Sequence, residues 1–299
     1  TTAMTTPTAT STTAAATTTT ASTAPDGGGL GFLKANLRDY GMLLSLVVIM
    51  AFFQVMTDGT LLQPLNLTNL ILQNSYIVIM ALGMLLVIVA GHIDLSVGSV
   101  CGFIGALAAV LMVQFDWHWL PAGLACLVCG GAIGAAQGWF IAWMRIPSFI
   151  VTLAGMLVFK GLALALLQGQ SVGPFPPEFQ LLSSGFIPDP FGGKGLRIFS
   201  LAIGMAVAAL LVVTKLRERA AQVAHGLADE PLPFFAAKIF VFVALIVVLA
   251  WQLATYKGLP NVLIVMALLM LLYDFVTRRM VIGRRLYALG GNEKAARLS

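Results

Sequence analysis

The chain has 299 residues, of which 59% are hydrophobic and only 10% are charged. Soluble domains carry about 25% charged residues, so this composition indicates an integral membrane protein and excludes a soluble domain. The formal net charge of +5 does not indicate nucleic-acid binding, because the basic residues stand at the ends of apolar segments, where they set membrane topology.

The start of the chain differs in composition from the rest. Thr1–Ala24 is rich in Thr, Ala and Ser and carries no charge. Such a low-complexity tract buries too little apolar surface to offset the entropy of ordering it. Residues 1–35 are therefore predicted to form a disordered tail, and residues 36–299 a single transmembrane domain.

The apolar runs after the tail predict an all-α protein with about eight transmembrane helices. A helix needs about 20 residues to cross the hydrocarbon core, and some of these runs need interfacial extensions to reach that length. In chain order, the expected spans are Tyr40–Met56, Ser75–Gly91, Leu95–Phe115, Leu120–Trp143, Phe149–Gln168, Ile198–Val213, Phe234–Leu253 and Pro260–Phe275.

The basic residues between these spans predict that the amino terminus is cytoplasmic, because cytoplasmic loops carry an excess of Lys and Arg. With that orientation, the external segments hold only Lys194, Arg197 and Lys257. The cytoplasmic segments hold Lys34, Arg38, Arg145, Lys215, Arg217, Arg219, Arg278, Arg279, Arg284, Arg285, Lys294 and Arg297.

The stretch Ala90–Val100, AGHIDLSVGSV, places a carboxylate between two long apolar runs. A carboxylate in hydrocarbon costs about 2.5 to 3.5 kcal/mol on insertion scales, so such a group usually faces protein or water. Two interpretations stay open. Asp94 or Ser96 caps the second of two helices joined by a short polar turn, or the stretch lines a transport path. The path candidates here are His92, Asp94, Ser96, Gly98 and Ser99.

Lys160 is the second candidate for a charge inside the membrane, near the middle of the span Phe149–Gln168. Such a lysine snorkels to the interface or bonds a nearby carbonyl. Alternatively it lines a path, with Asp94 as one partner and Asp274 as a less favourable one. Both interpretations stay open, and Lys160 joins the path candidates.

The longest external segment, Gly169–Arg197, contains five prolines and is predicted to hold no long helix. Either it forms a structured lid or docking surface for a partner, or it is a plain connector.

The cysteine and histidine patterns predict neither a metal site nor a catalytic centre. Cys126 and Cys129 form a CxxC within an apolar run, where packing explains them better than redox or metal chemistry. No phosphate-binding loop or nucleophile elbow is present. We therefore expect no enzymatic activity and no cofactor bound by this chain.

The basic stretch at residues 278–299 forms the second informative segment. Asn292 is a suitable helix cap after Gly290 and Gly291, and Glu293 stands in the first turn of a short amphipathic helix. Such a helix fits a groove on a partner protein or lies on anionic lipid. The residues alone favour neither.

Three motifs in order resemble the membrane permeases of bacterial ABC sugar importers, above all the ribose, xylose and multiple-monosaccharide branch. They are DLSVGS at Asp94–Ser99, RIPSFIVTLAGM at Arg145–Met156 and GRRLYALGGNEKAARLS at Gly283–Ser299. The resemblance implies a permease dimer in the bacterial inner membrane, a periplasmic sugar-binding protein outside it, and a separate ATPase subunit that binds ATP. Members of this family continue with further spanning helices, so this chain is expected to lack its C-terminal ones.

The resemblance also assigns residues. Asp94, Leu95, Ser96, Gly98 and Ser99 match the signature near the transmembrane path. The motif that engages the ATPase is matched by Gly290, Gly291, Asn292, Glu293, Ala295 and Ala296.

The expected function is the permease subunit of an ATP-driven importer of monosaccharides such as xylose, ribose or galactose. One alternative is a proton-coupled secondary transporter of small polar solutes, with His92, Asp94 and Lys160 as a relay. Another is a purely structural membrane subunit. The motif that resembles an ATPase-coupling helix favours the first.

Overall fold

The computed structural model describes residues 37–190, 195–225 and 232–296. The predicted tail at residues 1–35 lies outside the described residues. The chain divides into two units, residues 1–59 and 60–299, which are described separately.

The described part of the first unit holds one helix, α2 (Leu37–Met56), which contains the first expected span. Its apolar part within the described residues, Ser45–Met56, is shorter than a membrane-spanning helix. The helix ends in a turn that Gln54 stabilises. The side-chain amide of Gln54 donates to the Gly59 carbonyl (3.2 Å), and the backbone carbonyl of Gln54 accepts the Gly59 N–H (2.8 Å).

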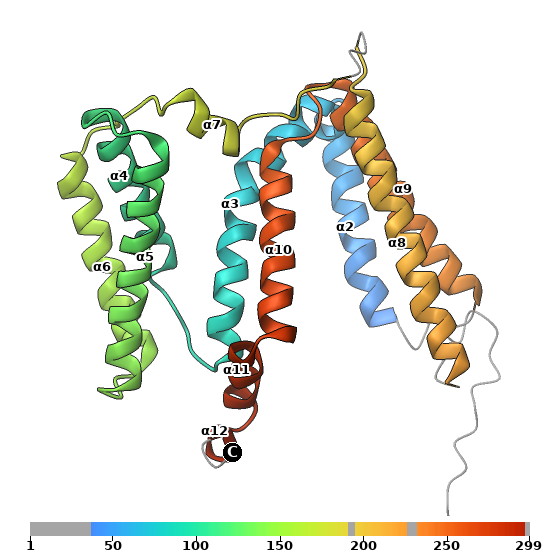
Figure 1. The fold of residues 1–299 in the computed structure, drawn as a ribbon. Coiled ribbons are helices and arrows are strands. Elements are labelled where there is room, and N and C mark those ends of the chain that lie inside the picture. The colour runs from blue at the N-terminus through green and yellow to red at the C-terminus, as the bar shows by residue number, and fades with distance from the viewer. Residues whose placement is uncertain (1–36, 191–194, 226–231, 297–299) are drawn as a thin grey trace, which may run out of the picture. The chain divides into compact units, whose positions relative to one another are not determined.

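The second unit is helical throughout its described part, apart from loops and one isolated bridge (Figure 1). Seven of its helical segments are long and apolar enough to cross a membrane, which confirms the all-α membrane fold. In chain order the elements are η1 (Thr60–Leu62), α3 (Pro64–Val89), α4 (Val97–Ala109), the π-helical turn η2 (Val110–Gln114), α5 (Trp119–Ala142), α6 (Ser148–Leu167), α7 (Pro177–Ser183), α8 (Ile198–Ala224), α9 (Leu232–Thr255), α10 (Asn261–Arg279), α11 (Val281–Gly291) and α12 (Glu293–Ala296).

The start of α3 lies well before the expected start of its span. We expected this span to begin at Ser75, whereas the helix begins at Pro64, a residue suited to a first helical turn. Two polar side chains before Ser75 bond to the helix itself: Thr68 Oγ1 donates to the Pro64 carbonyl (2.7 Å) and Asn74 Nδ2 to the Leu70 carbonyl (2.8 Å). Polar residues satisfied within their own helix do not end it.

Two other spans extend past their expected ends. α8 continues beyond Val213 to Ala224, and α10 continues beyond Phe275 to Arg279. The added turns are charged, and Lys and Arg are good helix formers outside the hydrocarbon core. Hydropathy therefore located the apolar parts of these helices and missed their polar extensions.

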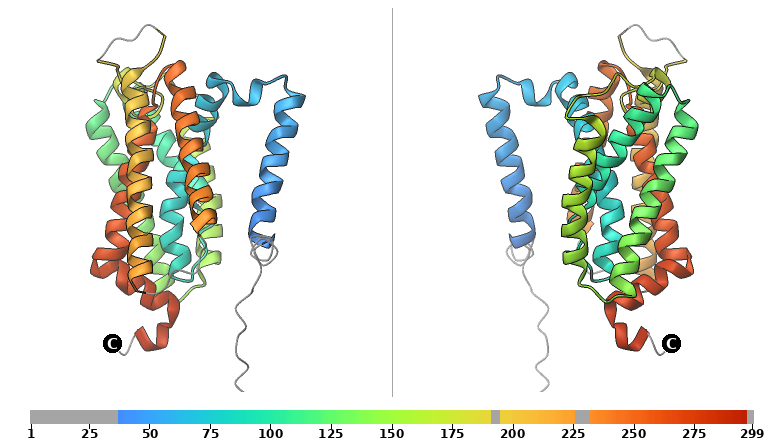
Figure 2. Two further views of the ribbon diagram at one scale, coloured as in Figure 1. Left: turned by 90° about the vertical axis from the view of Figure 1, so that its right-hand side faces the viewer. Right: turned by 90° about the vertical axis from the view of Figure 1, so that its left-hand side faces the viewer.

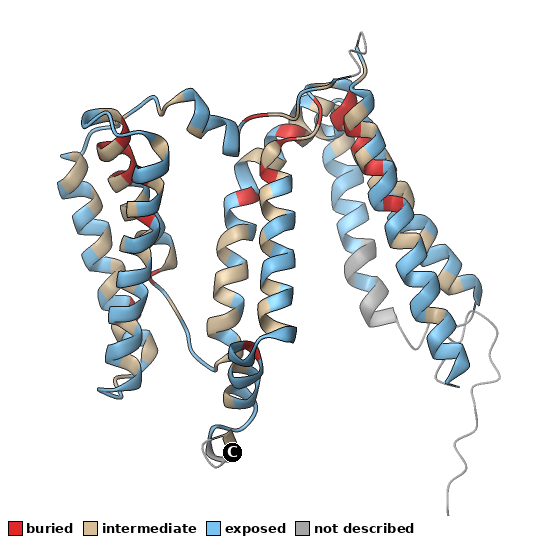
Figure 3. Ribbon diagram, viewed as in Figure 1, coloured by how far each residue is buried: buried red, intermediate tan, exposed pale blue. Residues whose placement is uncertain are grey.

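Small residues lie where the spans contact one another. α4 packs against α5 and α6, α3 against α10, and α8 against α9. Many of the buried residues lie at such contacts, and most of the large apolar residues on the spans are exposed (Figure 3). The buried residues include Ala106, Ala108, Ala109, Ala122, Ala208, Ala250 and Ala254. Close approach through small residues is typical of helices that are solvated by lipid.

Contacts between helix ends follow the expected alternation of spans. On the side predicted to be cytoplasmic, the Ile93 N–H donates to Ser148 Oγ (3.3 Å), which joins the turn before α4 to the start of α6. On the other side, the Arg197 N–H donates to the Ala254 carbonyl (2.9 Å), which joins the start of α8 to the end of α9. Each contact joins segments that the charge pattern assigns to one side.

The contact between α8 and α9 predicts a stability effect at Gly204. A methyl group added there would overlap the Ala250 side chain, whereas one added at Gly134 on α5 would meet no atom within 4 Å. We expect Gly204→Val to lower the free energy of unfolding by about 1 to 3 kcal/mol more than Gly134→Val does. Melting temperatures of the detergent-solubilised variants measure the difference, and equal melting would contradict this packing.

Candidate functional site

The turn between α3 and α4 ends one span and begins the next within a few residues. Gly91 adopts a left-handed conformation (φ 81°), which glycine reaches without strain. Its N–H donates to the Ile88 carbonyl (2.9 Å), and the His92 N–H donates to the Val87 carbonyl (3.1 Å). This pair of bonds is a Schellman motif, and it satisfies two of the last carbonyls of α3.

Asp94 organises the second half of this turn. One of its carboxylate oxygens, Oδ1, accepts both the backbone N–H and the hydroxyl of Ser96, each at 2.7 Å. Ser96 precedes the first residue of α4 and is 1% exposed, so these donors are shielded from water. A carboxylate at this position also faces the positive end of the α4 dipole. Asp94 thus forms an Asx turn just before α4. Ser96 is the N-cap residue of α4, and its side chain makes no capping bond, so the expected side-chain cap is absent here.

Ser96 connects this turn to α5. Its hydroxyl lies 3.1 Å from Nε2 of Gln137, which is placed to donate to it. Gln137 in turn lies against Gly155 on α6, where an added methyl group would come within 2.5 Å of the amide nitrogen and 3.5 Å of Ser96 Cβ. The start of α4, the end of α5 and the first half of α6 therefore meet at one small polar contact.

Ile93 connects the same turn to α6 through its backbone. Besides the bond from its N–H to Ser148 Oγ, its carbonyl accepts the Thr152 hydroxyl (3.3 Å), which also lies 2.9 Å from the Ser148 carbonyl. We name the six residues of these contacts the turn cluster: Ile93, Asp94, Ser96, Gln137, Ser148 and Thr152. Ser148 and Thr152 belong to the RIPSFIVTLAGM motif. Gln137 was not among the sequence candidates, and its only signal is an amide within an apolar run.

The other path candidates on this stretch lie around the turn cluster. Ser99 donates from its hydroxyl to the Ser96 carbonyl (2.8 Å), in the first turn of α4. Gly98 is exposed and has open space beside it, and the His92 side chain is exposed. His92 follows the end of α3, and Gly98 and Ser99 lie in the first turn of α4, so all three residues lie at the end of a span. With 26 residues, α3 is about 39 Å long, which exceeds the roughly 30 Å of hydrocarbon that it has to cross.

Lys160 lies apart from this turn. It is exposed on α6, about 18 Å further along the helix axis than Ser148 at 1.5 Å per residue. The turn cluster contacts the first residues of α6, so Asp94 and Lys160 do not pair in this structure. Asp274, the less favourable partner, lies 2.6 Å from Arg278. The structure therefore does not bring the residues of the proton relay together.

The carboxyl-terminal segment forms two helices where one was expected. α11 runs through Gly290 and Gly291, which we had placed before the helix, and the extended backbone of Asn292 separates it from α12 (Figure 2). The apolar and basic residues of 281–291 alternate with helical spacing, which explains the additional helix. As expected, α12 begins at Glu293, and the Ala296 N–H donates to the Asn292 carbonyl (2.9 Å).

The end of α11 contacts the end of α3 directly. A methyl group added at Gly290 would overlap the backbone carbonyl oxygen of Val89, the last residue of α3, whereas one added at Gly291 would meet no atom within 4 Å. The candidate ATPase-coupling segment therefore reaches the span that leads into the turn cluster.

The segment Gly169–Arg197, predicted to be external, holds only the short helix α7 in its described part, as the prolines predicted. Phe175 and Phe179 pack against a cluster around Met112, where the end of α4 meets the start of α5. Further along α7, the backbone carbonyl of Leu181 accepts a hydrogen bond from Asn261 Nδ2 at the start of α10 (2.7 Å). The segment is thus structured and joins α4 and α5 to α10.

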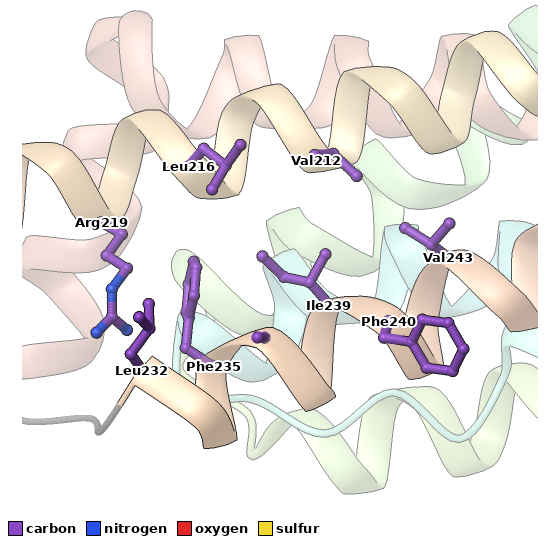
Figure 4. A pocket seen from close by; sticks show the side chains of 9 residues that line it. Val212, Leu216, Arg219, Leu232, Phe235, Ile239, Phe240 and Val243 are labelled. Atoms are coloured by element: carbon purple, nitrogen blue, oxygen red, sulfur yellow. The ribbon is translucent and has the colours of Figure 1, made fainter.

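Two surface grooves offer almost no polar groups. One, of about 380 Å³, lies between α8 and α9, and Arg219 at its end is 4.4 Å from the Phe235 ring (Figure 4). The other, of about 760 Å³, lies between α4, α5 and α7 and includes Gly123 and Phe179. Polyhydroxylated solutes need hydrogen-bond partners when buried, so neither groove suits a sugar.

Cys126 occupies a packing position. It is buried with Ala108, Met112 and Ala122, and its thiol lies 3.8 Å from the Ile104 carbonyl. Among the described residues, no three His, Cys, Asp or Glu side chains gather in a way that would hold a metal ion.

Residues 66–299 match the family described as the branched-chain amino acid transport system / permease component. The chain belongs to this family. The match includes the turn cluster, α11 and α12. The family description names a component of a transport system, so the permease works with other subunits, and it is a multi-pass membrane protein.

Individual relatives give a more specific comparison than the family description. The permease is 35% identical to the xylose transport system permease protein of Escherichia coli (strain K12), over 92% of this chain and 68% of that protein. It is 35% identical to the protein of the same name from Haemophilus influenzae, over 89% of this chain and 69% of the relative. The ribose import permease protein of Escherichia coli (strain K12) is 30% identical to this chain, over 90% of this chain and 63% of that protein. No solved structure matches the permease.

Proposed function

We propose that this permease is the membrane subunit of an ATP-driven importer of monosaccharides, and that a pentose such as xylose is its first substrate to test. The observation that carries the proposal is the 35% identity to xylose transport permeases across nearly the whole chain. The relatives named for ribose and D-allose transport support the wider substrate class of monosaccharides.

In this proposal, a separate ATPase subunit supplies the energy and engages α11 and α12. The six motif residues from Gly290 to Ala296 lie at the end of α11, at Asn292 between the two helices, and in α12, beyond the last span. Asn292 and Glu293 are exposed there, where a partner can reach them. The permease itself binds no cofactor, and ATP stays on the partner.

The proposed location is the bacterial inner membrane, with the amino terminus in the cytoplasm. The excess of basic residues between alternate spans supports this orientation. A periplasmic sugar-binding protein then docks on the opposite side, where α7 and its flanking loops present a structured surface. A second copy of the permease completes the assembly.

Transport in this scheme is alternating access: ATP closes the ATPase pair, and the spans move so that the sugar path opens to the other side. A neutral sugar suits a weakly polar path. The path candidates remain His92, Asp94, Ser96, Gly98, Ser99 and Lys160, with the turn cluster shaping the cytoplasmic end and Lys160 placed mid-span.

Capture of the ATPase from detergent-solubilised complexes tests this function. We expect the intact permease to retain its partner ATPase, and a variant with a Gly/Ser linker in place of Glu293–Ala296 to lose it. Uptake of labelled xylose by liposomes that contain the permease, the ATPase and the binding protein should require ATP. Uptake that needs no ATPase and stops with a proton uncoupler would instead identify a secondary transporter.

A further inference from the structure

Gly290 differs from its neighbour Gly291 in what lies beside it. At Gly290 the backbone carbonyl of Val89 occupies the space that any side chain would need, while at Gly291 that space is open. A backbone atom cannot rotate away as the end of a flexible side chain can, so only glycine permits this contact without moving α3 or α11. The two glycines of the coupling motif are therefore not equivalent.

The residue that Gly290 contacts is connected to the rest of the site by a short stretch of chain. Val89 ends α3, and the Schellman motif at Gly91 continues directly into the turn where Asp94 accepts the Ser96 N–H. From there, Ser96 bonds to Gln137 on α5, and Ile93 bonds to α6. A displacement of α11 would thus reach three spans through a turn that is hydrogen-bonded to both α5 and α6.

We propose that Gly290 is a positioning residue whose contact with Val89 transmits movement of α11 to the turn cluster, and that the bond between Ser96 and Gln137 passes it on to α5. This inference rests on the proposed function, because it assigns the route by which ATPase docking reaches the spans. It separates two roles within one motif: α12 binds the ATPase, and Gly290 converts that binding into movement of the helices.

The test compares docking with transport in the full-length permease, reconstituted with its ATPase and binding protein. We expect Gly290→Ala to lower sugar uptake per ATP hydrolysed about fivefold, in the range that disrupted coupling contacts give. Capture of the ATPase should stay within about twofold of the parent, because α12 is unchanged. Gly291→Ala changes the same motif without overlapping Val89, so its sugar uptake per ATP hydrolysed should fall less than that of Gly290→Ala.

Gln137→Met tests the other end of the route and guards against a folding defect at Gly290. Methionine has a similar size and lacks the amide that donates to Ser96, so it should uncouple uptake from hydrolysis in the same way. The neighbouring variant Gly138→Ala adds a methyl group where no atom lies within 4 Å and should behave as the parent. In the double variant, Gly290→Ala with Gln137→Met, sugar uptake per ATP hydrolysed should be no lower than in the more impaired of the two single variants.

Three results would overturn the proposal. Equal uptake per ATP in Gly290→Ala and Gly291→Ala would remove the contact with Val89 from coupling. Loss of ATPase capture in Gly290→Ala in proportion to uptake would make Gly290 a docking residue. Normal coupling in Gln137→Met would exclude the route through Ser96. If the parent permease captures no ATPase at all, the proposed function itself fails, and the inference falls with it.

Discussion

Asp94→Ala is expected to lower sugar uptake about 30-fold, whereas Asp94→Asn should retain most of it. Alanine removes the acceptor for two donors of Ser96. The hydroxyl keeps a second acceptor in Gln137 Oε1 (3.3 Å), but the buried N–H is left without a partner, which costs about 1 to 3 kcal/mol. A loss of about 2 kcal/mol in the correctly formed turn corresponds to the 30-fold change. Asparagine keeps an oxygen at the same position and loses only the charge.

The pair of variants distinguishes a carboxylate that acts as a hydrogen-bond acceptor in the turn from one that works by its charge. A proton relay requires a group that titrates, so it predicts that Asp94→Asn transports as poorly as Asp94→Ala. Uptake into liposomes at matched protein content measures both. If asparagine is as damaging as alanine while the protein remains folded, the acceptor role is insufficient and the charge itself takes part in transport.

The existence of the spans followed from hydropathy, but their ends depended on polar residues that hydropathy misreads. Thr68 and Asn74 lie inside α3 because each side chain bonds to a carbonyl of its own helix. Arg278 lies inside α10, where it pairs with Asp274 one turn earlier. Local bonds of this kind reduce the cost of a polar group in a helix, and a window of average hydropathy does not register them.

The turn cluster was accessible from sequence only in its local part. Asp94 and Ser96 are two residues apart, so capping could be weighed as one of two interpretations. Gln137 is 41 residues from Ser96 in sequence, and their contact depends on how α4, α5 and α6 pack. The contact of Gly290 with Val89 likewise required α11 to continue as a helix through both glycines, where we had expected the chain to break.

Gly155→Val is expected to abolish most uptake, with a loss of at least about tenfold, because α6 meets the turn cluster at this glycine. The first carbon of any side chain would lie 2.5 Å from the Gln137 amide and 3.5 Å from Ser96 Cβ. Gln137 can rotate away from a single methyl group, at the cost of its bond to Ser96. Valine adds two further methyl groups, and overpacking of this kind costs about 1 to 3 kcal/mol.

The matched control lies on the same helix. Gly161→Val introduces the same β-branched residue into α6, where an added methyl group meets no atom within 4 Å. Any cost of valine to the helix itself is therefore shared, and the difference between the two variants reports the contact at Gly155. Gly155→Ala should fall between them and resemble Gln137→Met, since both lose the bond between Gln137 and Ser96. Uptake that falls equally in Gly155→Val and Gly161→Val would show that α6 does not depend on this contact with α4 and α5.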